Sequence, residues 1–173
     1  MKLSLLLLTL AGCLLTASPS FGAKFSYPDE ENEWFTVDIP ATWKPEINDD
    51  DKSLEATSPD ESAYLAFWVL KNKKEVENID KDLDEILKDN ISKPKVEDKP
   101  LEKSINGIDF TIFKGSGIDA EDKSKVGFEI FLFSPKPGKL GIFFCQYPAD
   151  ADSKIIGSLV KIVESIKLTK KEK

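Results

Sequence analysis

Short apolar runs give the first indication of structure in this chain. Runs rich in aromatic and β-branched residues, closed by Pro, Gly or charged residues, are typical of strands. Four such runs stand out: 34–39, 62–70, 125–134 and 139–147. In the last three runs, both alternating faces are largely apolar, whereas a strand with one wet face alternates more cleanly. We therefore expect these strands to be covered on both sides, by a helix on each face or by a partner on one.

Two further patterns add strands. Residues 24–27 and 53–58 carry weaker strand signals that end at Pro28 and Pro59. Residues 101–105 and 108–115 flank Asn106-Gly107, and this dipeptide is the strongest short signal for a two-residue hairpin turn. Hairpins place sequential strands side by side and antiparallel, so the sheet should be mainly antiparallel.

Two segments change to a helical period. Apolar residues recur at helical spacing from Val76 to Ile91, with charged residues between them, and Pro94 closes the segment. A second amphipathic pattern runs from Ile155 to Ile166, and Asp150 or Asp152 can cap its start. The order of elements is several strands, a helix, four strands and a helix, which predicts an α+β fold.

The first residues have the pattern of an export signal. Met1-Lys2 precedes an almost continuous apolar run from Leu3 to Leu15, and small residues follow before the charge at Lys24. We interpret residues 1–23 as a signal peptide, residues 24–169 as a single domain and residues 170–173 as a frayed tail. The run is too short to be interpreted first as a spanning helix.

Two processing routes remain open. Residues 10–13 (Leu-Ala-Gly-Cys) resemble a bacterial lipobox, in which Cys13 would become the lipidated first residue. Ordinary cleavage after Gly22 or Ala23 is the alternative, and it is slightly favoured because apolar residues continue past Cys13. Only lipidation at Cys13 would place the protein on a membrane, through acyl chains and not through a span.

The charged residues exclude several classes of site. The chain has 173 residues, 31 acidic residues, no His, and 24 basic residues that are all Lys, for a net charge of −7. Without His there is no Ser-His-Asp site and no imidazole metal ligand. The missing Arg and the net charge disfavour nucleic-acid binding. We expect neither a cofactor nor a metal.

Two residue groups resemble sites but have simpler interpretations. Residues 48–51 and the carboxylates Asp119, Glu121 and Asp122 could supply oxygen ligands to calcium, but their spacing lacks the pattern of a calcium loop, so solvated loops are favoured. Cys145 lies in an apolar run with no basic neighbour, which favours a buried, unreactive thiol.

A family resemblance follows from two segments of the mature chain. The segments are Phe25-Ser26-Tyr27-Pro28 and Phe35-Thr36-Val37-Asp38-Ile39-Pro40-Ala41-Thr42-Trp43. They resemble the opening of PsbP-like domains, and the later order of elements is also similar. The resemblance implies an α/β/α sandwich with one mainly antiparallel sheet flanked by two helices. Relatives include photosystem PsbP, a Ran-binding nuclear import factor, DcrB-like exported proteins and chaperones of secreted effectors, whose roles are mostly binding or assembly.

The expected function is therefore stated as a class. We expect a non-enzymatic, exported accessory protein, periplasmic or secreted, that contacts an unidentified envelope or secreted protein. The alternative is a ligand- or lipid-binding module that uses an apolar face of the sheet. Candidate interaction residues are Trp43, Phe131 and Phe133. For each of them we favour packing in the core, and an exposed apolar patch would indicate binding instead.

Overall fold

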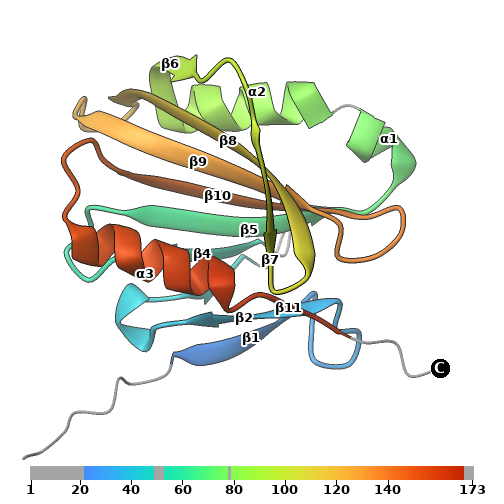
Figure 1. Ribbon diagram of the computed structural model, residues 1–173. Coiled ribbons are helices and arrows are strands. Elements are labelled where there is room, and N and C mark those ends of the chain that lie inside the picture. The colour runs from blue at the N-terminus through green and yellow to red at the C-terminus, as the bar shows by residue number, and fades with distance from the viewer. Residues whose placement is uncertain (1–21, 49–52, 78, 170–173) are drawn as a thin grey trace, which may run out of the picture.

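Strand pairing organises the molecule around one large antiparallel sheet (Figure 1). The computed structural model describes residues 22–48, 53–77 and 79–169. In chain order the elements are β1 (Ala23–Tyr27), β2 (Phe35–Ile39), a 3-10 helix (Ala41–Trp43), β3 (Glu46–Ile47), β4 (Leu54–Thr57), β5 (Tyr64–Leu70), α1 (Lys73–Glu77), α2 (Ile79–Asn90), β6 (Ile91–Val96), β7 (Leu101–Ile105), β8 (Ile108–Asp119), β9 (Lys125–Phe133), β10 (Leu140–Pro148), α3 (Ser153–Glu164) and β11 (Lys167–Leu168).

The large sheet has eight strands in the order β3-β4-β5-β10-β9-β8-β6, and β7 also pairs with β8. All of its pairs are antiparallel. The predicted hairpin turn is confirmed, because Asn106 and Gly107 have φ values of 54° and 77°. Such positive values at both central residues are what a type I′ turn requires.

Three layers result. We call the face of the large sheet toward α1 and α2 the outer face, and the opposite face the inner face. Figure 1 shows α1 and α2 on the outer face, and α3 with a second sheet on the inner face. This second sheet has three strands in the order β1-β2-β11. The α+β class and the antiparallel sheet are confirmed, but the prediction of one sheet flanked by two helices missed the second sheet.

The segment predicted as one helix from Val76 to Ile91 is also different. It holds α1 and α2, and α2 ends at Asn90, whose side-chain amide donates to the Ile86 carbonyl at 2.8 Å. Ile91 then pairs with Asp119 as the first residue of β6. Ile91 is 1% exposed, so its apolar side chain serves a strand rather than a helix face.

Alternation along the strands divides the apolar side chains into two cores. The inner core joins the large sheet to β2 and α3, with Phe35, Phe67, Phe143 and Ile162 among its fully buried members. The outer core lies between the sheet and α2, and contains Phe128, Ile142 and Phe144 with Leu87 of α2. The expectation of strands covered on both faces holds for β9 and most of β10.

The last helix forms as its sequence predicts. Asp152 is the N-cap of α3, and its Oδ1 accepts from the backbone N–H groups of Lys154 (2.7 Å) and Ile155 (3.0 Å). The apolar stripe of α3 then buries Leu159, Ile162 and Val163 against the inner face.

Candidate functional site

The outer face of β5 is apolar but only partly covered. Leu65, Phe67 and Val69 point into the inner core, so Tyr64, Ala66 and Trp68 point outward. A helix is about 10 Å wide and strands lie about 4.8 Å apart, so one helix covers only part of a sheet this wide. The helix α2 packs over β9 and β10, and the outer face of β5 lies at the margin of this cover.

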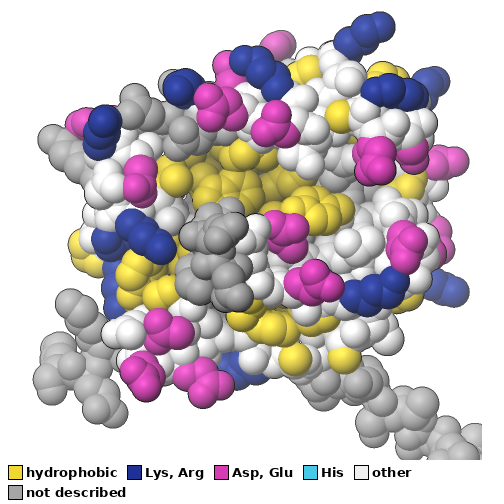
Figure 2. All heavy atoms as spheres, turned by 180° about the vertical axis from the view of Figure 1, so that it is seen from behind, with side chains coloured by type: hydrophobic (Ala, Val, Ile, Leu, Met, Phe, Trp, Pro, Cys, Tyr) yellow, Lys and Arg dark blue, Asp and Glu magenta, His cyan; other side chains and the backbone are white. Residues whose placement is uncertain are grey.

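A hollow of about 390 Å³ lies at this margin. We call it the aromatic hollow. Its apolar lining is formed by Tyr64, Ala66, Trp68, Phe144 and, from α2, Ile86. Its polar lining consists of Ser53, Glu55, Asp89 and Asn90. Figure 2 shows this face of the molecule, where hydrophobic side chains floor a depression and carboxylates lie around it.

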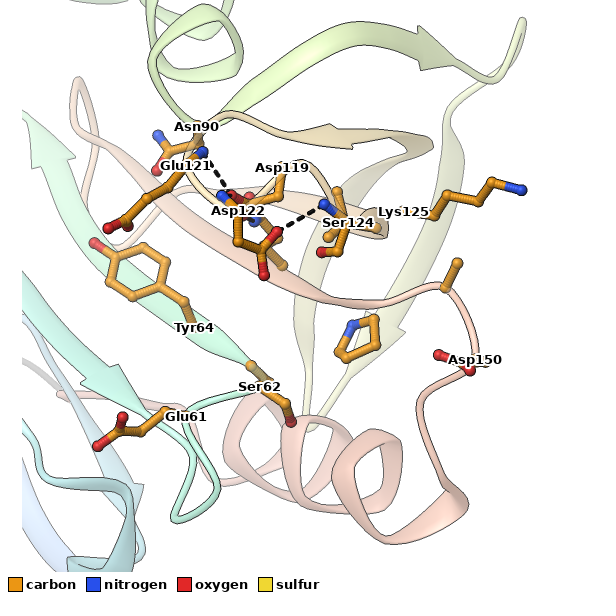
Figure 3. A pocket seen from close by; sticks show the side chains of 15 residues that line it. Glu61, Ser62, Tyr64, Asn90, Asp119, Glu121, Asp122, Ser124, Lys125 and Asp150 are labelled. Carbon is orange, nitrogen blue, oxygen red and sulfur yellow. Dashed lines mark hydrogen bonds between the residues drawn. The ribbon is translucent and has the colours of Figure 1, made fainter.

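A larger cleft of about 830 Å³ continues from the hollow at the start of β5. Tyr64 and Asn90 line both spaces, so the two are neighbours that meet at these residues. We call this second space the acidic cleft and the two together the outer groove. The carboxylates that line the cleft are Glu61, Asp119, Glu121, Asp122 and Asp150 (Figure 3). Lys125 is the one cation among its described lining residues.

One wall of the acidic cleft is the turn between β8 and β9. Asp119 Oδ1 accepts from the backbone N–H groups of Glu121 (2.7 Å) and Asp122 (2.9 Å), and Asp119 Oδ2 accepts from the Gln146 side chain. The Ser124 N–H donates to Asp122 Oδ1 at 2.7 Å. This bond holds the pKa of Asp122 below its usual value, so the wall is anionic at neutral pH.

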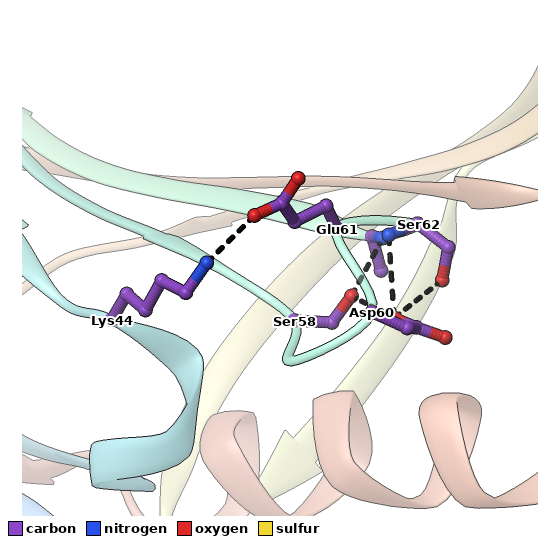
Figure 4. A network of polar contacts seen from close by, with 6 residues as sticks. Lys44, Ser58, Asp60, Glu61 and Ser62 are labelled. Carbon is purple, nitrogen blue, oxygen red and sulfur yellow. Dashed lines mark hydrogen bonds and ion pairs between the residues drawn. The ribbon is translucent and has the colours of Figure 1, made fainter.

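The other wall is the turn between β4 and β5 (Figure 4). The buried Ser58 hydroxyl accepts from the Ala63 N–H at 2.9 Å and donates to Asp60 at 2.5 Å. Asp60 also accepts from the Ser62 hydroxyl at 2.8 Å. The Ser58 hydroxyl, followed by Ser62, lowers the pKa of Asp60. The neighbouring Glu61 pairs with Lys44 at 2.7 Å, and this hydrogen bond lowers the pKa of Glu61.

Negative charge dominates the whole rim. A third hollow, of about 350 Å³, adjoins at Glu61 and Tyr64 and adds Glu46 and Lys44. Among the described residues that line the three spaces, eight carboxylates face two lysines. The carboxylates are Glu46, Glu55, Glu61, Asp89, Asp119, Glu121, Asp122 and Asp150. The field in the groove therefore favours a cationic ligand.

Potential metal ligands do not cluster among the described residues. Within residues 22–48, 53–77 and 79–169, no three Asp, Glu, Cys or His side chains are grouped closely enough to hold a metal ion. Asp119 Oδ1 and Asp122 Oδ1 accept hydrogen bonds within their own turn, and Asp119 Oδ2 accepts from Gln146. Across the same ranges, no helix is both long and apolar enough to span a bilayer.

A smaller cavity of about 200 Å³ lies on the inner face beneath α3. Its polar residues form a chain, because Glu129 Oε1 contacts Lys114 Nζ at 2.8 Å and Tyr147 Oη at 3.2 Å. Burial, followed by the Glu129 charge, raises the pKa of Tyr147. Burial likewise raises the pKa of Cys145, so this thiol is protonated and a poor nucleophile. The volume is below the 300–1,000 Å³ typical of ligand pockets.

The interaction residues suggested by sequence lie elsewhere. Trp43, Phe131 and Phe133 are 3%, 8% and 2% exposed, all within the inner core, so they form no exposed patch. The 3-10 turn and β9 direct these three side chains into the core, as the sequence favoured. Cys13 lies outside the described residues. Gly22 immediately precedes β1, whose first residue is Ala23, and the cleavage proposal remains a prediction.

Sequence reasoning did not single out Tyr64 and Trp68. The sequence did hold a signal for them. Residues 64–70 are apolar on both faces, but a single predicted helix is available to cover the outer face of this strand and its neighbours. The helix was too narrow to cover every strand, and that leaves an aromatic surface on β5.

Comparisons with known proteins concern the fold. No family model matches the chain, and no curated protein matches it. A crystal structure of a protein from Bacteroides thetaiotaomicron aligns over 87% of this chain with a TM-score of 0.59 and 16% identity, and the chain spans 49% of that protein. The solution structure of cyanobacterial PsbP (CyanoP) from Synechocystis aligns over 92% of this chain and 99% of that one, with a TM-score of 0.54 and 11% identity. The chain has a PsbP-like fold.

Proposed function

We propose that the protein is a non-enzymatic, exported accessory protein of the cell envelope that binds another protein through the outer groove. The observation that carries this proposal is the outer face of β5, where Tyr64 and Trp68 are half-buried and floor a hollow beside α2. Aromatic side chains of this kind are enriched in protein interfaces because they combine a large apolar area with a polar edge.

The pKa shifts of three carboxylates in or beside the cleft fit a binding role better than acid–base catalysis. A general acid or base works best with a pKa near the working pH. The pKa values of Asp60, Glu61 and Asp122 are instead held below their usual range, because hydrogen bonds stabilise their charged forms. These groups remain carboxylates through the neutral range, which suits electrostatic recognition.

The PsbP-like fold is compatible with an accessory role. The PsbP-like domains that the chain resembles have mostly binding or assembly roles, and fold alone does not select a partner. The alternative of a lipid- or ligand-binding module has weaker support, because the apolar cavity beneath α3 is about 200 Å³, below the volume typical of ligand pockets.

Site-specific photo-crosslinking in the native organism tests the proposal. A photoreactive phenylalanine analogue replaces Trp68, and the control position is Val96, which is 45% exposed on β6 and lines none of the spaces described above. We expect a discrete protein adduct from position 68 and none from position 96. Fractionation of the same cells tests export.

Competition establishes that the adduct is specific. Excess purified wild-type protein should suppress the adduct, whereas a folded Trp68→Ala variant should suppress it at least about tenfold less effectively, because interface tryptophans commonly carry 2 kcal/mol or more. Equal adducts from positions 68 and 96, or equal competition by the variant, would contradict binding through the groove.

A further inference from the structure

We infer that the outer groove selects a partner segment that carries a lysine or arginine about four to six residues from an apolar side chain. This inference rests on the function proposed above and adds the chemistry of the partner. The apolar side chain enters the aromatic hollow, and the cationic side chain enters the acidic cleft.

Charge complementarity identifies the cationic group. Of the described residues that line the acidic cleft, five are carboxylates and one is a lysine. Lys44, on the margin of the groove, is already paired with Glu61. Carboxylates that surround one cleft repel each other, and a cationic side chain from a partner relieves that repulsion.

Two carboxylates remain available for such a ligand. The side chains of Glu121 and Asp150 are exposed and make no hydrogen bond or ion pair with any other described residue, and both line the cleft. Asp119 and Asp122, in contrast, hold the β8–β9 turn. The turn carboxylates thus shape the cleft, and Glu121 and Asp150 are the groups that a partner cation can engage without disturbing it.

A buried acceptor lies beside these groups. Gln146 Nε2 donates to Asp119, whereas Gln146 Oε1 is buried and has no hydrogen-bond donor among the described residues. Unsatisfied buried acceptors are rare in folded proteins. Because Gln146 Oε1 itself is enclosed, the groups of this cleft that the donor-rich head group of lysine or arginine can reach are the exposed carboxylates.

The geometry of β5 sets the spacing of the partner motif. Trp68 lines the aromatic hollow and Tyr64 lies where the hollow meets the cleft. Four residues of strand separate them, which corresponds to about 13 Å. An extended partner segment therefore needs about four residues to reach from its apolar side chain to the boundary of the cleft. Its cationic residue lies at that position or one or two residues further on.

Selection from a library of random peptides of about 12 residues tests the inference, since such peptides span about 40 Å when extended. The full chain without its first 22 residues is immobilised, and bound peptides are sequenced. We expect enrichment of lysine or arginine about four to six positions from an aromatic or aliphatic residue. Selected peptides without a cation, or a library that yields no binder, would overturn the inference.

Matched variants connect the selected peptides to the cleft. The double variant Glu121→Gln/Asp150→Asn should weaken a selected peptide about tenfold at low salt, and Trp68→Ala should weaken it by a similar factor. The control Asp98→Asn/Asp109→Asn removes the same charge from exposed positions that line none of the spaces and should change affinity less than twofold. Equal losses in both double variants would overturn the inference.

The outcomes also separate this inference from the function proposed above. A Trp68-dependent protein adduct whose contact segment carries no cation would leave the function standing and refute the cationic motif. Spermidine provides the rival ligand: if it displaces the peptide at equal concentration and Trp68→Ala has no effect on peptide affinity, the cleft is a polyamine site and the inference is wrong.

Discussion

The cap of α3 offers a direct test of the physical reasoning. Asp152 has an extended backbone (φ −70°, ψ 162°) and its carboxylate accepts two N–H groups of the first turn of α3. Replacing an N-cap Asp by Ala costs about 1 kcal/mol, and losing a negative charge at a helix start adds about 0.3–1 kcal/mol. Asp152→Ala should therefore destabilise the protein by about 1.5 kcal/mol, or about 3–6 °C in Tm.

Urea unfolding followed by tryptophan fluorescence measures this loss. Asp152→Asn should recover most of it, because Asn caps almost as well and only the charge is removed. The control is Asp150→Ala, two residues earlier, where the exposed carboxylate makes no hydrogen bond with any described residue and the expected change is below about 0.5 kcal/mol. Equal effects at positions 150 and 152, or a stable Asp152→Ala variant, would refute this account of the cap.

Three other outcomes are expected. Phe143→Ala should lower the free energy of unfolding, measured by thermal unfolding, by about 3–5 kcal/mol. Phe143 is fully buried, and the centroid of its ring lies 4.4 Å from that of the stacked Phe67 ring. Gly107→Ala should lower the free energy of unfolding by about 1–2 kcal/mol. The cause is the positive φ of this residue and not a clash, because a Cβ there meets nothing within 4 Å. The Ser58 hydroxyl lowers the pKa of Asp60, so ionised Asp60 stabilises the folded state. This contribution to the free energy of unfolding is complete above about pH 4 and is lost as the pH falls through the lowered pKa. Urea midpoints of Asp60→Asn and wild type should therefore differ at pH 6 and converge at acidic pH.

Local patterns predicted most elements because their signals are local. The Asn106-Gly107 turn and the Asp152 cap need only a few neighbouring residues, and both occur as the sequence indicates. The break after Asn90 could not be predicted in the same way. Ile91 continues the helical spacing, but it pairs with Asp119, and such a contact between distant residues leaves no trace in a short window.

The second sheet was missed for a related reason. The strand at 34–39 was predicted, but alternation does not say which sheet a strand joins. Its partners are β1 and the two-residue β11, where Lys167 pairs with Thr36, and a strand of two residues carries no periodic signal. The outer groove depends on the width of α2 relative to the large sheet, which also becomes visible only after the chain has folded.

The unequal size of the two cores has a consequence for local unfolding. The inner core contains 22 buried side chains among the described residues and the outer core contains eight, of which Leu87 alone comes from a helix. Layers held by few buried contacts open before the whole domain unfolds. In native-state hydrogen exchange, we expect amides of α1 and α2 to exchange through such openings while β9 and β10 stay protected. Each opening would uncover Phe144 and widen the surface next to Trp68.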